Sequence, residues 1–145
     1  MARFYPCKTI SPGNAQGEAV ISSEEILFYF TDPATGRITE HGHCLEGQSI
    51  AGKILGFPGG KGSSVVQADG LYKLEQSGMQ PAGLIVQNLD TVLVSAAVIM
   101  EIPMVCEVPD SLCLALENGM TLKINTDENT IELPDKANRP KILFS

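Results

Sequence analysis

The sequence predicts an α/β domain, built on a mixed sheet or a pair of sheets with about three helices, and two observations support this. In the middle of the chain, short continuous apolar runs alternate with helix-like segments, for example residues 81–86 before residues 92–100. This alternation is the pattern of β-α-β units, whose strands are buried on both faces. Towards both ends, short apolar runs are separated by glycine- and proline-containing turns. That second pattern is typical of strands and hairpins.

The first part of the chain is predicted to be β-rich. Residues 3–10 form one expected strand, Ser11-Pro12-Gly13 a turn, and residues 17–22 a second strand. The apolar and aromatic residues 26–30 precede Asp32-Pro33-Ala34-Thr35-Gly36, in which proline favours a β-turn. We therefore expect a loop or hairpin between the second strand and the centre of the chain.

The centre of the chain is the stretch 53–64, an apolar run that opens into a glycine-rich loop and then a helix. Ser63 or Ser64 is placed to cap a helix over residues 65–77. Backbone donors at such a helix start attract a carboxylate or a phosphate, and Lys61 adds a positive charge. The loop is not a Walker A motif, because Lys61 precedes the last glycine, Gly62. It has two interpretations: an anion pocket containing a hydroxyl, or a tight strand-to-helix connection with a serine cap.

After this loop, the spacing of Val65, Ala68, Leu71 and Tyr72 or Leu74 predicts a helix that packs on a sheet with these residues. The run at 81–86 predicts a buried strand, 92–100 a buried helix and 103–105 a further strand. A capped helix is expected over 110–117, followed by a hairpin of residues 121–125 and 130–133. Residues 134–145 are charged and contain proline, and are expected to be an extended arm or disordered tail behind a single domain at residues 1–133.

Composition excludes several classes of function. The chain has 145 residues, 43% of them hydrophobic, which suits one buried core. With 10 basic and 17 acidic residues its net charge is −7, and no basic cluster is present. Nucleic acid and membranes are therefore not expected as partners. The start lacks the apolar core of a signal peptide, so a cytoplasmic protein is expected.

Metal-ligating residues are few. The four cysteines are Cys7, Cys44, Cys106 and Cys113, with no Cys-x-x-Cys pair, so no metal site or cluster is expected on this chain. The polar stretch 41–49 places His41 and His43 beside Cys44 and Glu46. A metal site here would need unusual local geometry. We favour a structural or interface loop.

Several motifs together resemble the small subunit of aconitase X enzymes over residues 3–133. They are Leu-Glu-Gly-Gln-Ser at 45–49, Gly-Lys-Gly-Ser-Ser at 60–64 and Ile-Pro-Met-Val at 102–105. The resemblance implies a swivelling β/β/α domain, related to the mobile fourth domain of aconitase. It also implies a heterodimer with a large subunit that carries an iron–sulfur cluster. The implied activity is that of a hydro-lyase, a dehydratase that removes water from a hydroxy acid.

The same resemblance implies which residues act. Aconitase has Gly-Ser-Ser-Arg, whose first serine is the base that removes the proton, and this position corresponds to Ser63. Lys61, Gly62 and Ser64 are then expected to bind substrate. The sequence departs from aconitase at Val65, where aconitase has arginine. Lys61 is therefore the candidate for that anion-binding role.

Two other functions remain to be compared with this one. Swivelling phosphohistidine carriers resemble residues 95–105, but they have histidine in Thr-Ser-His-Ala-Ala where this chain has Ser95, and a serine cannot serve as the nitrogen carrier. A binding module without catalysis is the other. For the substrate, the opening residues 2–13 are similar to bacterial small subunits, which implies cis-3-hydroxy-L-proline. The alternative, implied by archaeal members of the family, is mevalonate 5-phosphate.

Overall fold

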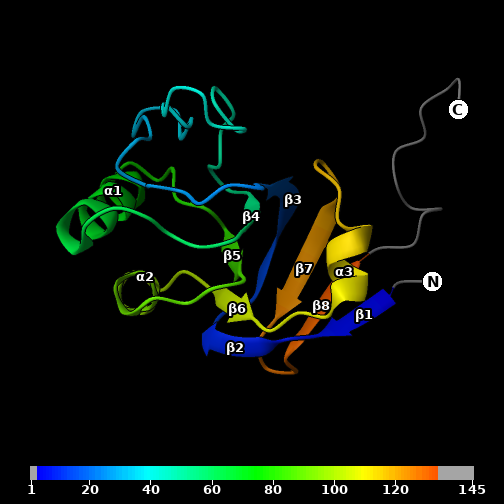
Figure 1. Cartoon of the computed structure of the whole chain (residues 1–145). Coiled ribbons are helices and arrows are strands. Elements are labelled where there is room, and N and C mark those ends of the chain that lie inside the picture. The colour runs from blue at the N-terminus through cyan, green and yellow to red at the C-terminus, as the bar shows by residue number, and fades with distance from the viewer. Residues whose placement is uncertain (1–2, 134–145) are drawn as a thin grey trace, which may run out of the picture.

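The computed structural model describes residues 3–133, which form eight strands and three helices (Figure 1). The predicted tail, residues 134–145, lies outside the described residues. None of the helices within residues 3–133 is long and apolar enough to span a bilayer. In chain order the elements are β1 (Arg3–Pro6), β2 (Lys8–Ser11), β3 (Ala15–Ile21), β4 (Ile54–Phe57), α1 (Ser64–Gln76), β5 (Gly83–Val86), α2 (Thr91–Ile99), β6 (Met104–Cys106), α3 (Asp110–Ala115), β7 (Thr121–Asn125) and β8 (Thr130–Leu133).

The strands follow the order β1-β8-β7-β3-β4-β5-β6-β2. From β3 to β6 the pairing is parallel, whereas β1, β8, β7 and β3 pair in antiparallel fashion, so β3 belongs to both halves. The strands β1 and β2 stand at opposite ends of this order, yet Cys7 alone separates them in the chain. The sheet therefore curls until its two ends meet along one continuous segment, which Figure 1 shows beneath the other strands.

The curled sheet creates two apolar cores. Inside it, residues from both halves pack together, with Ile54, Ile85, Leu122, Ile131 and Leu133 fully or almost fully buried. The second core lies between the parallel strands and the helices α1 and α2, and its buried residues include Leu55, Leu71, Leu84, Val86 and Leu93. Two β layers and one helical layer result, which confirms the predicted β/β/α architecture.

The beginning of the chain differs from the prediction. Instead of one strand over residues 3–10, β1 pairs with β8 and β2 pairs with β6, and the chain changes partner at Cys7, whose N–H donates to Asn129 O. Such pairings link distant parts of the sequence, so local pattern alone does not reveal them. The predicted second strand is present as β3, and the predicted C-terminal hairpin is β7–β8.

Helix α1 buries only part of the predicted face. Leu71 and Leu74 are fully buried as expected, but Val65 is 78% exposed and Tyr72 is 51% exposed. The buried stripe starts instead at Gln67 and includes Gly70, where the backbone of Phe28 crosses the helix so closely that no side chain would fit. The stripe begins with a glutamine and a glycine, so an apolar pattern cannot identify its start.

Residues 22–53, between β3 and β4, contain no named helix or strand. Isolated bridges join parts of this segment, including Thr31 with Ile38, and Gly36 N–H donates to Asp32 O across the predicted turn. The segment nevertheless belongs to the second core, since Phe28 is fully buried and its ring meets that of Phe57 edge to face at 5.7 Å. It lies over α1 and the end of β4, as Figure 1 shows.

Candidate functional site

The glycine-rich loop, residues 58–63, leaves the carboxyl end of β4 and leads into α1. In parallel α/β sheets this is the edge at which ligands bind. The loop is held by Ile26: its N–H donates to Gly59 O at 3.0 Å, and Lys61 N–H donates to Ile26 O at 3.2 Å. Gly62 has φ of +95°, a conformation that favours glycine, and a Cβ there would lie 2.6 Å from Leu27 Cδ1.

Ser63 occupies the N-cap position of α1. Its backbone is extended, with φ −71° and ψ 159°, and its carbonyl accepts the first helical hydrogen bond from Gln67 N–H at 3.0 Å. The side chain is exposed and makes no capping hydrogen bond, unlike that of Asp90, whose Oδ1 accepts from Leu93 N–H at 2.8 Å at the start of α2. The first turn of α1 contains no acidic residue. Among the side chains that the structure describes, the Ser63 hydroxyl thus has no hydrogen-bond partner, and it lies at the positive end of the helix dipole.

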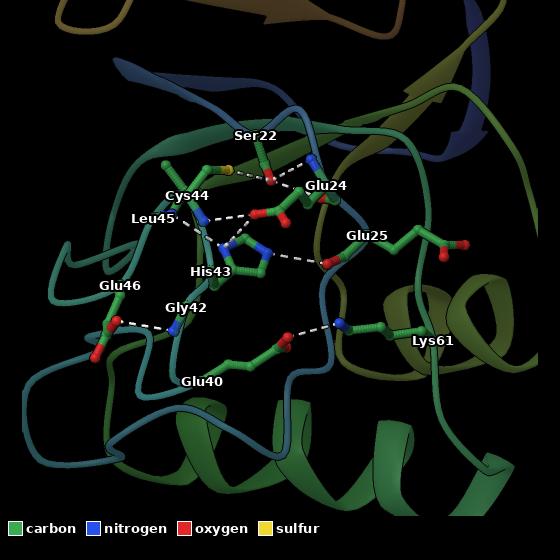
Figure 2. A network of polar contacts seen from close by, with 10 residues as sticks. All are labelled: Ser22, Glu24, Glu25, Glu40, Gly42, His43, Cys44, Leu45, Glu46 and Lys61. Atoms are coloured by element: carbon green, nitrogen blue, oxygen red, sulfur yellow. Dashed lines mark hydrogen bonds and ion pairs between the residues drawn. The ribbon is translucent and has the colours of Figure 1, made fainter.

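Lys61 has a partner that the sequence does not reveal. Its Nζ lies 2.7 Å from Glu40 Oε2, and the two side chains are 37% and 21% exposed (Figure 2). The other carboxylate oxygen, Glu40 Oε1, is buried and has no hydrogen-bond partner within the described residues. Residues 58–63 are therefore joined by an ion pair to the 22–53 segment, and the charge of Lys61 is balanced within the chain.

The other predicted substrate-binding residues, Gly62 and Ser64, adjoin Ser63. Gly62 O accepts a hydrogen bond from Gln67 Nε2 at 3.0 Å, and Ser64 is the first residue of α1. Ser95, the position compared with the phosphohistidine carriers, is an exposed residue of α2.

His43 is buried between two loops, and both its ring nitrogens are engaged (Figure 2). Leu45 N–H donates to Nδ1 at 3.0 Å, so Nδ1 carries no hydrogen, and Nε2–H donates to Glu25 O at 3.0 Å. This neutral ring cannot form an ion pair with Glu24, whose Oε2 is 3.9 Å from Nδ1. His43 fastens residues 42–45 to residues 24–25, which agrees with the structural loop favoured from sequence.

Glu24 and Cys44 complete a cluster with His43, in which one ligand atom from each lies within 4.8 Å of the others. Cys44 N–H donates to Glu24 Oε2 at 2.5 Å, and this bond lowers the pKa of the Glu24 carboxyl. Cys44 Sγ lies 3.5 Å from Ser22 Oγ. Since the one lone pair of Nδ1 already accepts a hydrogen bond from Leu45 N–H, a metal ion could bind Nδ1 only by displacing that amide. The stretch forms a hydrogen-bonded loop.

His41 and Glu46 lie on the exposed side of this stretch. Glu46 Oε1 accepts from Gly42 N–H at 3.0 Å, and this bond, with a smaller contribution from His41, lowers the pKa of the Glu46 carboxyl. His41 Nδ1 is 3.3 Å from Glu46 Oε2, and its side chain is fully exposed.

The four cysteines do not fit an iron–sulfur cluster, which is held by several cysteine thiolates at one place. Burial is the main cause that raises the pKa of Cys7 and of Cys106, and it favours the thiol form of both. Cys44 and Cys113 are exposed on other segments. Within residues 3–133 the Glu24, His43 and Cys44 group is the one cluster of metal-ligating residue types.

Comparison with known proteins decides the family. The family described as "Aconitase X swivel domain" matches residues 4–133, nearly the whole described chain. The chain belongs to the aconitase X swivel domain family. This confirms the resemblance seen in the sequence motifs.

Relatives of this swivel domain are similar along most of their length. The phosphomevalonate dehydratase small subunit of Thermococcus gammatolerans is 40% identical over 124 residues, which cover 85% of this chain and 92% of the relative. The protein of the same description from Methanosarcina acetivorans is 39% identical over 127 residues, covering 87% and 88%. The crystal structure of Thermococcus kodakaraensis aconitase X in its holo-form superposes with a TM-score of 0.82 at 35% identity, covering 92% of this chain and 99% of that one.

Proposed function

We propose that this swivel domain is the small subunit of an aconitase X-type hydro-lyase, in which Ser63 removes a proton from a carbon atom of a hydroxy acid. Family membership and the descriptions of the relatives support the hydro-lyase assignment. The single observation that supports Ser63 is its hydroxyl, which stands at the N-cap of α1 without serving as the cap. An exposed serine at a helix start would ordinarily use its oxygen to satisfy a backbone N–H.

A serine hydroxyl is a weak acid, so its alkoxide needs stabilisation before it can act as a base. The N-terminus of α1 supplies part of this, because it carries partial positive charge and no acidic side chain in its first turn. Lys61 is expected to supply a cation and to bind an anionic group of the substrate. Because Lys61 pairs with Glu40, the substrate would compete with that carboxylate for the ammonium group.

The partner is proposed to be an aconitase-like large subunit. The description "small subunit" carried by the relatives implies a second, larger chain. Since the cysteines of the present chain do not fit an iron–sulfur cluster, we assign the cluster to that subunit. The isolated chain is expected to be colourless and inactive. An iron–sulfur absorption band from this chain expressed alone would contradict the assignment.

Mevalonate 5-phosphate is the substrate we propose. Both reported relatives are described as phosphomevalonate dehydratase small subunits, at 39–40% identity, and this supports the alternative from sequence over cis-3-hydroxy-L-proline. Assay of the reconstituted heterodimer with each compound separates the two. Turnover of cis-3-hydroxy-L-proline with none of mevalonate 5-phosphate would reverse the order.

Replacement of Ser63 by alanine tests the central residue. In the reconstituted heterodimer Ser63→Ala should lower kcat by about 10²- to 10⁴-fold, the range for loss of a positioned base. The melting temperature should stay unchanged, since no capping bond is lost. Ser64→Ala is the neighbouring control and should lower kcat much less. If Ser63→Ala retains more than about a tenth of kcat, a loss far below that expected for a base, Ser63 is not the base.

A further inference from the structure

Gln67 is a polar residue on the buried face of α1, only 7% exposed. Its side chain lies against the glycine-rich loop. Nε2 donates to Gly62 O at 3.0 Å, while its backbone N–H donates to Ser63 O at 3.0 Å. Gln67 therefore donates a hydrogen bond to the carbonyl oxygen before Ser63 and another to the carbonyl oxygen of Ser63 itself.

The other end of the same carboxamide touches Gly60. A Cβ built on Gly60 would overlap Gln67 Oε1, so a residue larger than glycine there would push the carboxamide aside. Gln67 Oε1 is buried and has no hydrogen-bond partner within the described residues. An unpartnered buried amide oxygen is unfavourable for folding, and an apolar side chain would avoid this cost. Stability alone therefore does not account for glutamine at this position.

We propose that Gln67 is the positioning residue for Ser63. It fixes the loop at Gly60 by contact and at Gly62 by a side-chain hydrogen bond, and the backbone bond to Ser63 O joins the loop to α1. The backbone of Ser63, and with it the direction of its Cα–Cβ bond, is thereby fixed without a capping bond from the hydroxyl. This inference rests on the proposed function, because it concerns how the proposed base is held.

The test compares Gln67→Met in two backgrounds of the reconstituted heterodimer. Methionine fills a similar volume but cannot donate to Gly62 O. In the otherwise wild-type chain kcat should fall by about 10²-fold with little change in KM, as expected for a displacement of about 1 Å at a reacting group. With Ser63→Ala already present, Gln67→Met should cause no further loss. Gln76→Met, at an exposed position of the same helix, is the matched control and should leave kcat unchanged.

The inference is refuted if the loss of kcat caused by Gln67→Met does not depend on Ser63. If Gln67→Met lowers kcat by the same factor with and without Ser63, or leaves kcat unchanged in the wild-type chain, Gln67 does not act through Ser63. If Ser63→Ala alone retains more than about a tenth of kcat, the proposed base is wrong, and the positioning role fails with it. These two failures are distinguished by the single Ser63→Ala variant.

Gly60→Ala provides a second route to the same displacement. Its added Cβ should push the carboxamide away from Gly62 and lower kcat, whereas in a Gln67→Ala chain the same change should have little further effect.

Hydrogen exchange of the Lys61 amide, which donates to Ile26 O, reports on the loop without any catalysis. Exchange should be faster in Gln67→Met than in Gln76→Met. Equal exchange in both variants would show that Gln67 does not hold the loop.

Discussion

The ion pair between Lys61 and Glu40 allows the stability and binding roles of Lys61 to be separated. Lys61→Met removes the ammonium group and leaves the Glu40 carboxylate, one oxygen of which is buried without a partner in the described structure. Exposed ion pairs contribute about 0–1 kcal/mol, and removal of one partner from a fully buried pair costs about 3–5 kcal/mol. With side chains 21% and 37% exposed, we expect a loss of about 1–2 kcal/mol in the free energy of unfolding.

Thermal melting measures this loss. A domain of this size gains roughly 0.3 kcal/mol/K of entropy on unfolding, so 1–2 kcal/mol corresponds to a fall of about 3–7 °C in Tm. Lys61→Met combined with Glu40→Gln should recover most of the fall, because no unpaired carboxylate remains. If the double variant melts as low as Lys61→Met, the loss comes from the lysine stem and not from the uncompensated charge.

The KM for the substrate tests the binding role of Lys61. Glu40→Gln leaves the Lys61 ammonium without its carboxylate, so an anionic substrate no longer competes for it. At about 4 Å, one unit charge contributes about 1 kcal/mol in water and more at a partly buried site, which predicts a fall in KM of about five- to tenfold. Lys61→Met should raise KM by a similar factor, and both effects should shrink at high salt. A KM unaffected by both changes would refute substrate binding by Lys61.

Three further predictions concern stability. Gly70→Ala should destabilise the fold by about 1–3 kcal/mol in denaturant titrations, because the added Cβ would overlap the backbone of Phe28. This loss is expected although alanine forms helices better than glycine does. Equal or greater stability of the variant would contradict the close approach of the Phe28 backbone. The pKa of Glu24 is lowered from 4.5 by the Cys44 amide, so its contribution is complete above pH 4.5 and is lost as pH falls through the lower folded value. The Tm of Glu24→Gln should thus depend less steeply on pH than that of the wild type as pH falls below 4.5, and parallel curves would contradict this. Asp90→Ala should lose about 0.5–2 kcal/mol through its capping bond, whereas Ser63→Ala should lose none; similar losses would show that Ser63 also caps its helix.

Local pattern was sufficient for the strands in the middle and at the end of the chain. The apolar run ending at Val86 and the hairpin ending at Leu133 are strands as predicted, because continuous burial and turn residues act over a few positions. Local pattern was less accurate for two helices: the one expected over 110–117 is α3 (Asp110–Ala115) and has no side-chain cap, and Val98 and Ile99 of the expected buried helix are exposed. The break at Cys7 was not predictable, since it depends on which distant strands accept the two halves of the segment. Val65 was assigned to the wrong face of α1 because the true buried stripe begins at Gln67.

In the candidate site, too, the residues within one local motif could be predicted, whereas those from distant segments could not. Ser63 and Lys61 could be proposed from the glycine-rich loop and its resemblance to aconitase, because both lie within one short motif. Glu40 could not, since it reaches Lys61 from 21 residues away through an irregular segment. Gln67 had a weak signal: a polar residue four positions after Ser63, on the face that also carries Leu71 and Leu74. Polarity at that position pointed to solvent, whereas the loop backbone supplies its hydrogen-bond partner.

The single-residue connection at Cys7 makes the pairing of β1 depend on β8, which is the last strand to be synthesised. Arg3 pairs with Leu133, so β1 has no partner until nearly the whole chain has been synthesised. During synthesis β3 can pair with β4, and β4 with β5, but the inner core stays open until β7 and β8 leave the ribosome. Long-range pairing of this kind slows folding, because loop closure must precede the contacts that stabilise it. Truncation before β8 should therefore expose the inner core as a whole, including the packed Ile54 and Ile85 side chains from the middle of the chain.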